Sequence, residues 1–299
     1  MTEVLATTPG LFPLPDWAKD ELSDLKGHQK DDLISGSESG AVVDAYGRAR
    51  SEVVDRQAEA GLDRVIEGQL RWDDMLAHPL CVHENVDTRG IVRYYDNNNF
   101  YREPVVEGEL TYDGDVAAEL DGAAFLDGVS EFLADEAEAL PDVETLFLLE
   151  PSLVTNPPGE GEDRRASRAV DRVADAVETD VVVHTYWGAI PEKPYAHLMD
   201  ADVDAIGLDF VSDHEQNLYN IQEYGTKDSV ALGVVDGKNT LVETPEEIAE
   251  RIEWVAENVP AEEFETVFAT ANTELFYLPV NRFEAKLDAL AAGAEVVSL

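Results

Sequence analysis

The sequence predicts an α/β fold: a single (β/α)8 TIM-type barrel that takes in all of residues 1–299. Short β-branched or apolar runs alternate along the chain with segments of helical periodicity. About eight strands can be counted, the number that an α/β barrel needs. The Gly-x-Gly-x-x-Gly sequence that favours a doubly wound open sheet follows none of these strands. We therefore prefer a one-domain barrel to an open sheet.

The predicted strands are short apolar runs that end close to polar or aromatic residues. They comprise residues 4–8, 64–69, 145–151, 180–187, 205–211, 229–237 and 266–275, and the segment 104–112 is the candidate for an eighth strand. Residues 71–104 are rich in Asn, His and aromatic side chains, and they are predicted to form an irregular loop insertion.

The predicted helices carry apolar residues at helical spacing and alternate with the strands. They comprise residues 44–63, 123–140, 163–179, 193–201, 214–225, 244–259 and 281–294. Gly61 is expected to end the first of these helices. Thr244, with Glu247 three residues later, has the pattern of a capping box at the start of a later helix.

The chain is strongly acidic. It carries 64 acidic residues against 21 basic ones, for a formal net charge of -43, while 44% of its residues are hydrophobic. The hydrophobic content predicts a folded protein. The charge argues against binding to nucleic acid or to anionic membrane surfaces, because phosphate groups require Lys and Arg. Since the acidic residues are spread along the whole chain, we interpret them as a halophilic-type adaptation to a salt-rich cytoplasm.

Two further features favour a cytoplasmic location. The N-terminal segment MTEVLATTPGLFPLP has neither the basic region nor the long apolar region of a secretory signal, and no apolar run reaches the length of a membrane span. The single cysteine, Cys81, excludes an internal disulfide and is consistent with a reducing compartment.

Polar and aromatic residues follow most of the predicted strands, and in an α/β barrel the ligand binds at these carboxyl ends. A loop at residues 93–104 adds further aromatic and amide side chains. We predict that one pocket for a flat, polar small molecule is lined by Asp96, Asn98, Glu150, Tyr186, Trp187, Asp209, Asp236, Asn272 and Glu274. Any one of them could instead cap a helix or hydrogen-bond within a loop.

A cluster of metal-ligating residue types lies in the sequence HPLCVHE, which places His78, Cys81, His83 and Glu84 close together. Such residues can bind zinc, but this spacing matches no standard zinc pattern. We prefer to interpret the segment as a surface loop with one half-buried cysteine, and a metal site is the alternative.

Six segments that run in order along the chain are similar to segments of cobalamin-independent methionine synthases. They are QAEAGLDRVIEGQLRWDDML (57–76), RYYDNNNFYREPVV (93–106), LEPSLV (149–154), TYWGAI (185–190), LGVVDGKN (232–239) and NTELFYLPV (272–280). The similarity runs from about residue 7 to residue 287. Of the two barrels in that family, it favours the N-terminal, zinc-free barrel over the zinc-bearing C-terminal one.

The resemblance also implies that this chain itself binds no metal. In the zinc-bearing barrel two ligands come from a His-Thr-His-Met-Cys sequence, whose counterpart here is HTYWG. The ligand positions then fall on Tyr186 and Gly188, while His184 matches the histidine that is not a ligand. The other two ligand positions fall near Gly207 and at Thr273.

The function implied by the resemblance is methyl transfer in methionine biosynthesis. The family moves a methyl group from methyltetrahydrofolate to homocysteine; zinc holds the sulfur as a thiolate, and an acid protonates the departing nitrogen. We therefore expect the zinc-free barrel of a split enzyme, which works with a zinc-bearing paralogous barrel. One alternative is a non-catalytic barrel that binds a methyl carrier or stabilises its partner. Another is a metal-free, decarboxylase-like enzyme on the same fold.

Overall fold

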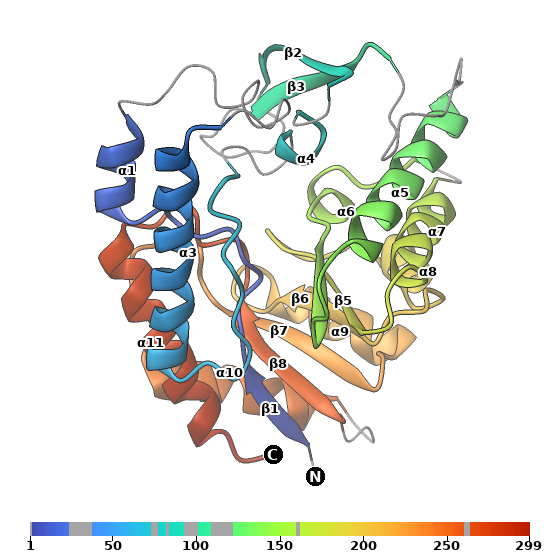
Figure 1. Cartoon of the computed structure of the whole chain (residues 1–299). Coiled ribbons are helices and arrows are strands. Elements are labelled where there is room, and N and C mark those ends of the chain that lie inside the picture. Colours follow the sequence, from blue (N-terminus) through green and yellow to red (C-terminus); the bar gives the residue numbers. More distant parts are fainter. Residues whose placement is uncertain are drawn as a thin grey trace.

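The main sheet contains six parallel strands (Figure 1). The computed structural model describes residues 2–23, 38–72, 77–81, 84–92, 101–108, 122–159, 162–259 and 264–299. The strands of this sheet are β1 (Glu3–Ala6), β4 (Thr145–Leu149), β5 (Asp180–His184), β6 (Ala205–Asp209), β7 (Ser229–Val235) and β8 (Thr266–Ala271), in the spatial order β1-β8-β7-β6-β5-β4. Six of the predicted strands are thereby confirmed.

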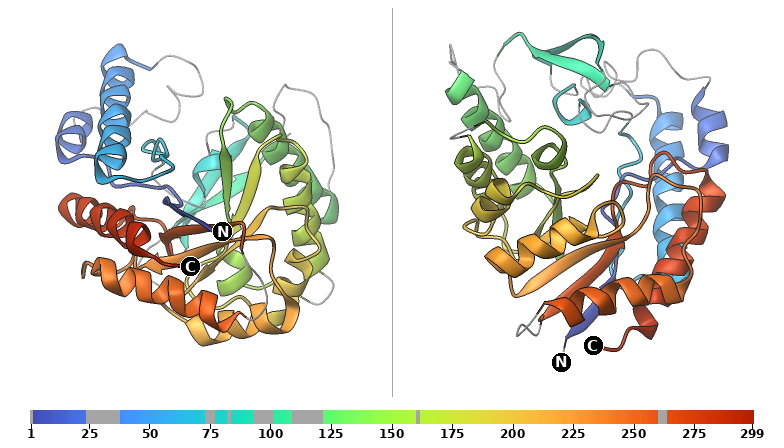
Figure 2. Two further views of the ribbon diagram at one scale, coloured as in Figure 1. Left: turned by 90° about the horizontal axis from the view of Figure 1, so that it is seen from below. Right: turned by 180° about the vertical axis from the view of Figure 1, so that it is seen from behind.

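The sheet is curled. The rings of Phe147 on β4 and Phe268 on β8 meet edge to face with their centroids 6.0 Å apart, although three strands lie between β4 and β8 in the sheet. Nε2 of His184 on β5 lies 3.0 Å from the carbonyl oxygen of Ala271 on β8. Such contacts across one face require strong curvature, which gives the sheet the shape of a half-barrel (Figure 2).

Strand residues alternate between the two faces of this curled sheet. On β5, Val181 and Val183 pack in the large core against the surrounding helices. Val182 between them joins a small apolar cluster with Ala205, Phe268 and neighbouring side chains on the other face. Both faces are therefore filled with side chains, as expected for a parallel sheet.

Helices cover the convex face of the sheet (Figure 2). The longer helices of the chain are α1 (Asp16–Ser23), α3 (Gly40–Ala60), α5 (Gly122–Glu138), α7 (Asp163–Ala174), α9 (His214–Tyr224), α10 (Pro245–Asn258) and α11 (Val280–Val296). The shorter ones are α6 (Ser152–Thr155), α8 (Glu192–Leu198) and α4 (His78–Cys81), which lies away from the main sheet. The predicted capping box is confirmed, since Thr244 and Glu247 exchange side-chain and backbone hydrogen bonds at the start of α10. Gly61, with φ of 90°, ends α3 as predicted. Within the described ranges no helix is both long and apolar enough to cross a bilayer.

The strand predicted at residues 64–69 is wrong. The chain there turns through Gly68 and Gln69, which have φ of 86° and 49°. The backbone of Ile66 is bonded by the buried amide of Gln57: its N–H donates to Oε1 over 3.0 Å, and its carbonyl accepts from Nε2 over 2.7 Å. A side chain on α3 thus takes the place of a neighbouring strand, and the structure supports a half-barrel where a full (β/α)8 barrel was predicted.

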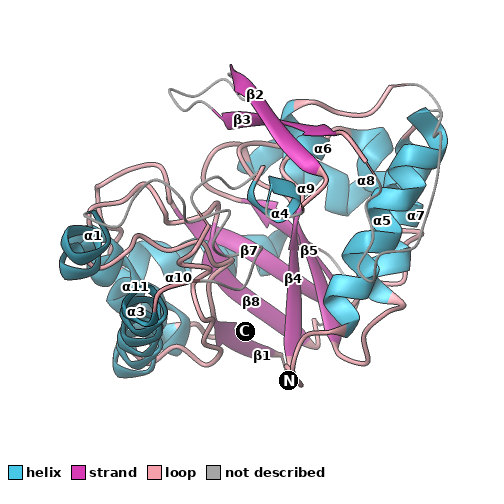
Figure 3. Ribbon diagram, turned by 45° about the horizontal axis from the view of Figure 1, so that its top comes forward, coloured by secondary structure: helices cyan, strands magenta, loops and turns pink. Residues whose placement is uncertain are grey.

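The second departure lies in residues 71–104, which are not irregular throughout. Strands β2 (Val86–Val92) and β3 (Tyr101–Val106) form a separate antiparallel sheet with an irregular register between Thr88 and Ile91. The start of the predicted strand 104–112 therefore belongs to β3, while residues 109–112 lie outside the described residues. Figure 3 shows this hairpin on the side of the molecule toward which the strands of the main sheet run.

Candidate functional site

The carboxyl ends of the strands gather the predicted site residues at one edge of the main sheet, which we call the carboxyl edge. Glu150 directly follows β4, Asp209 ends β6, and Asp236 and Asn272 directly follow β7 and β8. Because all six strands are parallel, these positions share one edge. Asp96 and Asn98 lie outside the described residues, so their predicted place at this edge stays a prediction.

Asp209 is the most highly bonded carboxylate at the carboxyl edge. It is completely buried, and its Oδ1 accepts hydrogen bonds from the backbone N–H of Val211 over 2.9 Å and of Ser212 over 2.8 Å. The amide of Asn272 donates to both carboxylate oxygens over 3.1 and 3.2 Å. Asp209 thus orders the β6–α9 loop and ties it to the end of β8.

Asn272 extends the network to the β7–α10 loop. Its Oδ1 accepts a hydrogen bond from the N–H of Gly237 over 3.0 Å. A Cβ atom at Gly237 would lie 2.6 Å from both Glu274 O and Thr273 Cγ2, so only glycine allows this close approach. These contacts join Asp209 to Asn272 and place Asn272 and Glu274 beside Gly237, while the prediction that all the predicted site residues line one pocket stays a prediction.

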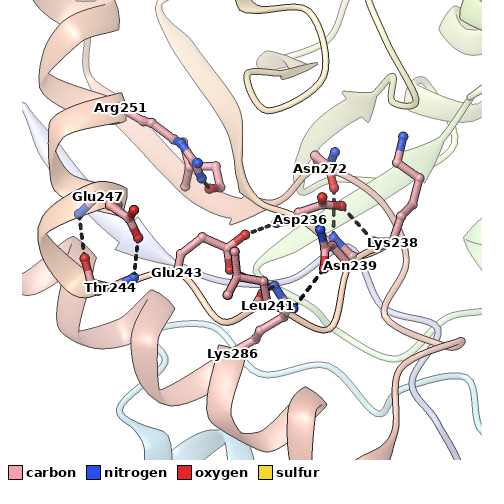
Figure 4. Close-up of polar contacts among 12 residues, drawn as sticks. Asp236, Lys238, Asn239, Leu241, Glu243, Thr244, Glu247, Arg251, Asn272 and Lys286 are labelled. Atoms are coloured by element: carbon pink, nitrogen blue, oxygen red, sulfur yellow. Dashed lines mark hydrogen bonds and ion pairs between the residues drawn. The ribbon is translucent and has the colours of Figure 1, made fainter.

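A buried ion pair joins the β7–α10 loop to α11 (Figure 4). Nζ of Lys286 on α11 lies 2.7 Å from Oε2 of Glu243, and the lysine side chain is completely buried. Oε1 of Glu243 accepts a hydrogen bond from the N–H of Asp236 over 2.8 Å. This pair was not predicted from the sequence. The sequence feature that could have indicated it is a lysine at position 286, on the same apolar face of α11 as Phe283 and Leu290.

The β5–α8 loop carries the predicted aromatic residues. Tyr186 is completely buried, and its ring meets the ring of Trp187 at 88° with centroids 5.2 Å apart. Two buried asparagines on α9, which the sequence analysis also missed, hold this loop. Asn217 donates to Gly188 O over 3.3 Å and to Asp209 O over 2.8 Å, and Asn220 donates to Ile190 O over 2.7 Å.

Two carboxyl groups at the carboxyl edge have raised pKa values. Burial raises the pKa of Glu150 above its ordinary value, against the opposing effect of hydrogen bonds from the hydroxyl and the N–H of Ser152. Burial raises the pKa of Glu274 to about 7, with the hydroxyl of Thr273 as its nearest donor. Glu274 can therefore hold or release a proton near neutral pH, which is the property that a general acid needs.

The raised pKa of Glu274 predicts a pH-dependent effect on stability. Between about pH 4.5 and 7 the unfolded chain ionises this group while the folded chain keeps it protonated, so rising pH costs stability. The loss is complete above pH 7 and amounts to roughly 3 kcal/mol. We expect Glu274→Gln to gain stability relative to the native chain as pH rises through this window, measured by denaturant unfolding at pH 5 and pH 8.

The matched control is Glu295→Gln, at an exposed position near the end of α11. We expect the free energy of unfolding of this variant to differ from that of the native chain by the same amount at pH 5 and at pH 8. If the free energy of unfolding of Glu274→Gln differed from that of the native chain by the same amount at pH 5 and pH 8, Glu274 would not titrate near neutrality in the folded protein.

Comparison with known proteins agrees with this arrangement. Residues 129–260 match the family model described as the N-terminal domain of the cobalamin-independent synthase. The 5-methyltetrahydropteroyltriglutamate–homocysteine methyltransferase of Bacillus velezensis is 30% identical over 152 residues, which are 50% of this chain and 19% of the relative. The Bacillus subtilis protein of the same name is 27% identical over 135 residues, 44% of this chain and 17% of the relative.

The chain resembles the N-terminal domain of cobalamin-independent methionine synthases. The segments that match these relatives span no more than about a fifth of the relatives' length. A B12-independent methionine synthase from Shewanella, solved in complex with selenomethionine, aligns with a TM-score of 0.78 at 18% identity over 98% of this chain and 96% of its own. A putative one from Listeria monocytogenes aligns with a TM-score of 0.63 at 15% identity over 99% and 98%. These structures support the fold.

The resemblance to the zinc-bearing barrel implies that its ligand positions fall on Tyr186 and Gly188, near Gly207 and at Thr273. None of these side chains is one that ordinarily binds zinc. At Gly207 a Cβ atom would lie 2.3 Å from Nδ1 of His184, so a glutamate cannot enter without displacing that histidine. The residues present do not fit the metal, and in the described part of the chain no three His, Cys, Asp or Glu residues form a potential metal site.

His184 is a buried residue of the sheet. It is completely inaccessible to solvent, and burial lowers the pKa of its imidazole. Its Nε2 lies 3.0 Å from the carbonyl oxygen of Ala271, and its ring meets the ring of Tyr186 at a centroid distance of 5.8 Å. It links β5 to β8 beneath the carboxyl edge.

The HPLCVHE segment is partly helical where a loop was predicted. His78 and Cys81 lie at the two ends of α4, and the cysteine is buried in an apolar cluster with Ala77 and Val86. The ring of His78 stacks on Trp72 with centroids 5.6 Å apart. His83 lies outside the described residues, so the metal alternative for this segment is not tested by the structure.

Proposed function

We propose that this chain is a methyltransferase barrel of methionine biosynthesis and that it acts as the zinc-free barrel of a split methionine synthase. The observation that supports the proposal is the match of residues 129–260 to the N-terminal domain of cobalamin-independent synthases. The methyl donor is of the methyltetrahydrofolate type, the acceptor is homocysteine, and the zinc lies on a paralogous barrel.

The carboxyl edge offers chemistry that suits this role. Methyl transfer from a tertiary nitrogen needs an acid to protonate that nitrogen as it departs, and such an acid works best with a pKa near the operating pH. Glu274 has a pKa of about 7 and stands at this edge beside the β7–α10 loop. Trp187 is partly exposed in the β5–α8 loop, against the buried ring of Tyr186, and supplies aromatic surface. In this proposal the zinc of the partner barrel activates the homocysteine thiol as a thiolate.

The first prediction of this proposal concerns metal content. We expect the purified chain to hold no stoichiometric zinc after dialysis, because the four family positions lack ligands. Elemental analysis of the native chain beside Cys81→Ser measures this. Zinc at one atom per chain that is lost in Cys81→Ser would instead establish a site in the HPLCVHE segment.

The proposal as a whole is tested by methyl transfer. Transfer of a labelled methyl group from 5-methyltetrahydrofolate to homocysteine is measured with the chain alone and with the zinc-bearing barrel from the same cell. Turnover that requires both chains supports the split enzyme.

A further inference from the structure

Ser212 and Lys238 place two hydrogen-bond donors side by side at the carboxyl edge. Ser212 follows β6 and Lys238 follows β7, and both residues are exposed. Nζ of Lys238 donates to Oγ of Ser212 over 3.3 Å, and Nδ2 of Asn272 lies 3.4 Å from the same oxygen. The serine oxygen accepts in both contacts, so its own hydrogen is directed elsewhere. The ammonium group carries three hydrogens, of which this contact uses one.

We propose that Ser212 and Lys238 bind a carboxylate of the ligand. A carboxylate has two oxygens that only accept hydrogen bonds, so it complements a hydroxyl donor beside an ammonium donor. The inference rests on the proposed function for the identity of the ligand. Two sources of the group fit that function: the α-carboxylate of an amino acid such as homocysteine, and a glutamyl carboxylate of a folate-type donor.

The neighbouring acidic side chains are hydrogen-bonded or partly protonated, which limits their repulsion of an anionic ligand. Both carboxylate oxygens of Asp209 accept hydrogen bonds from the protein, and Oδ1 of Asp236 accepts the N–H of Lys238 over 2.9 Å. Glu274, whose pKa burial raises to about 7, is about half protonated at pH 7, and the protonated form carries no charge. In a chain of net charge -43, an anionic ligand needs a local cation, and Lys238 supplies it.

The loop that carries Lys238 is held in place before any ligand binds. Gly237 donates its N–H to Oδ1 of Asn272, and Glu243, paired with the buried Lys286, accepts the N–H of Asp236 (Figure 4). A donor on an anchored loop loses little conformational freedom on binding, which favours affinity.

The test measures affinity for three ligands at fixed ionic strength, by NMR titration of the full chain: L-homocysteine, 5-methyltetrahydrofolate and glutarate as a simple dicarboxylate. We expect Lys238→Met to weaken binding by roughly tenfold or more and Ser212→Ala by a smaller factor. Lys238→Arg should retain affinity within about threefold, because it keeps the charge and the donors. The matched control is Lys19→Met, at an exposed lysine on α1.

The pattern of loss identifies the source of the carboxylate. A loss confined to homocysteine assigns the group to the amino acid, and a loss confined to the folate assigns it to the glutamyl tail. Equal affinities of the native chain and Lys238→Met for all three ligands, or no binding of any of them by the native chain, overturn the inference. Glutarate binding that depends on Lys238, without binding of the other two, supports the carboxylate site and overturns the proposed function.

Discussion

Lys286→Met is expected to lower the free energy of unfolding by about 3–5 kcal/mol, because it leaves the carboxylate of Glu243 buried without its counter-charge. The side chain of Lys286 is completely buried, and its Nζ lies 2.7 Å from Glu243 and also bonds to the carbonyl oxygen of Leu241. The measurement is denaturant unfolding at pH 7. Local effects should centre on the β7–α10 loop, where the N–H of Asp236 bonds to Glu243, and amide hydrogen exchange can detect them.

Two control variants separate this effect from the general loss of a lysine. Lys19→Met removes an exposed lysine that pairs with Asp16, and it should change the free energy of unfolding by less than about 1 kcal/mol. The double variant Lys286→Met with Glu243→Leu removes both charges, so it should lose less stability than Lys286→Met alone. A loss below about 1 kcal/mol for Lys286→Met would show that the pair does not stabilise the loop.

The parts of the fold that could be predicted from the sequence are those in which local pattern and tertiary structure agree. The apolar run at 180–184 and the capping box of Thr244 and Glu247 are read directly from residue types and spacing. The strand at 64–69 could not be excluded in this way. Its apolar residues suit a strand, but the side chain of Gln57, on the preceding helix, takes up the backbone hydrogen bonds of Ile66.

The candidate site, too, could be predicted from the sequence only in part. Asp209, Asp236, Asn272 and Glu274 could be placed together because parallel strands bring their carboxyl ends to one edge. The nearby cation, Lys238, was not among the residues predicted to line the pocket. Lys238 reaches Ser212 only because two loops, which follow different strands, fold toward each other.

We propose that this chain supplies one barrel of a two-chain methyltransferase. Methyl transfer requires a homocysteine thiolate, and a free thiol with a pKa near 8.5 is only a few per cent ionised at pH 7. Zinc supplies the activation in the family, but the resemblance implies that its ligand positions fall here on Tyr186 and Gly188, near Gly207 and at Thr273. Lys238, the cation found at the carboxyl edge, donates to Ser212 and is assigned in our proposal to a carboxylate of the ligand, so it does not replace zinc at the sulfur. We therefore expect the isolated chain to be inactive.

The measurement that tests this claim most directly is reconstitution of methyl transfer from 5-methyltetrahydrofolate to homocysteine. It is run in molar salt, where a chain of net charge -43 has its self-repulsion screened. We predict no transfer above background by this chain alone and restored transfer when the zinc-bearing barrel from the same cell is added. Sustained turnover by this chain alone after treatment with a chelator would contradict the account.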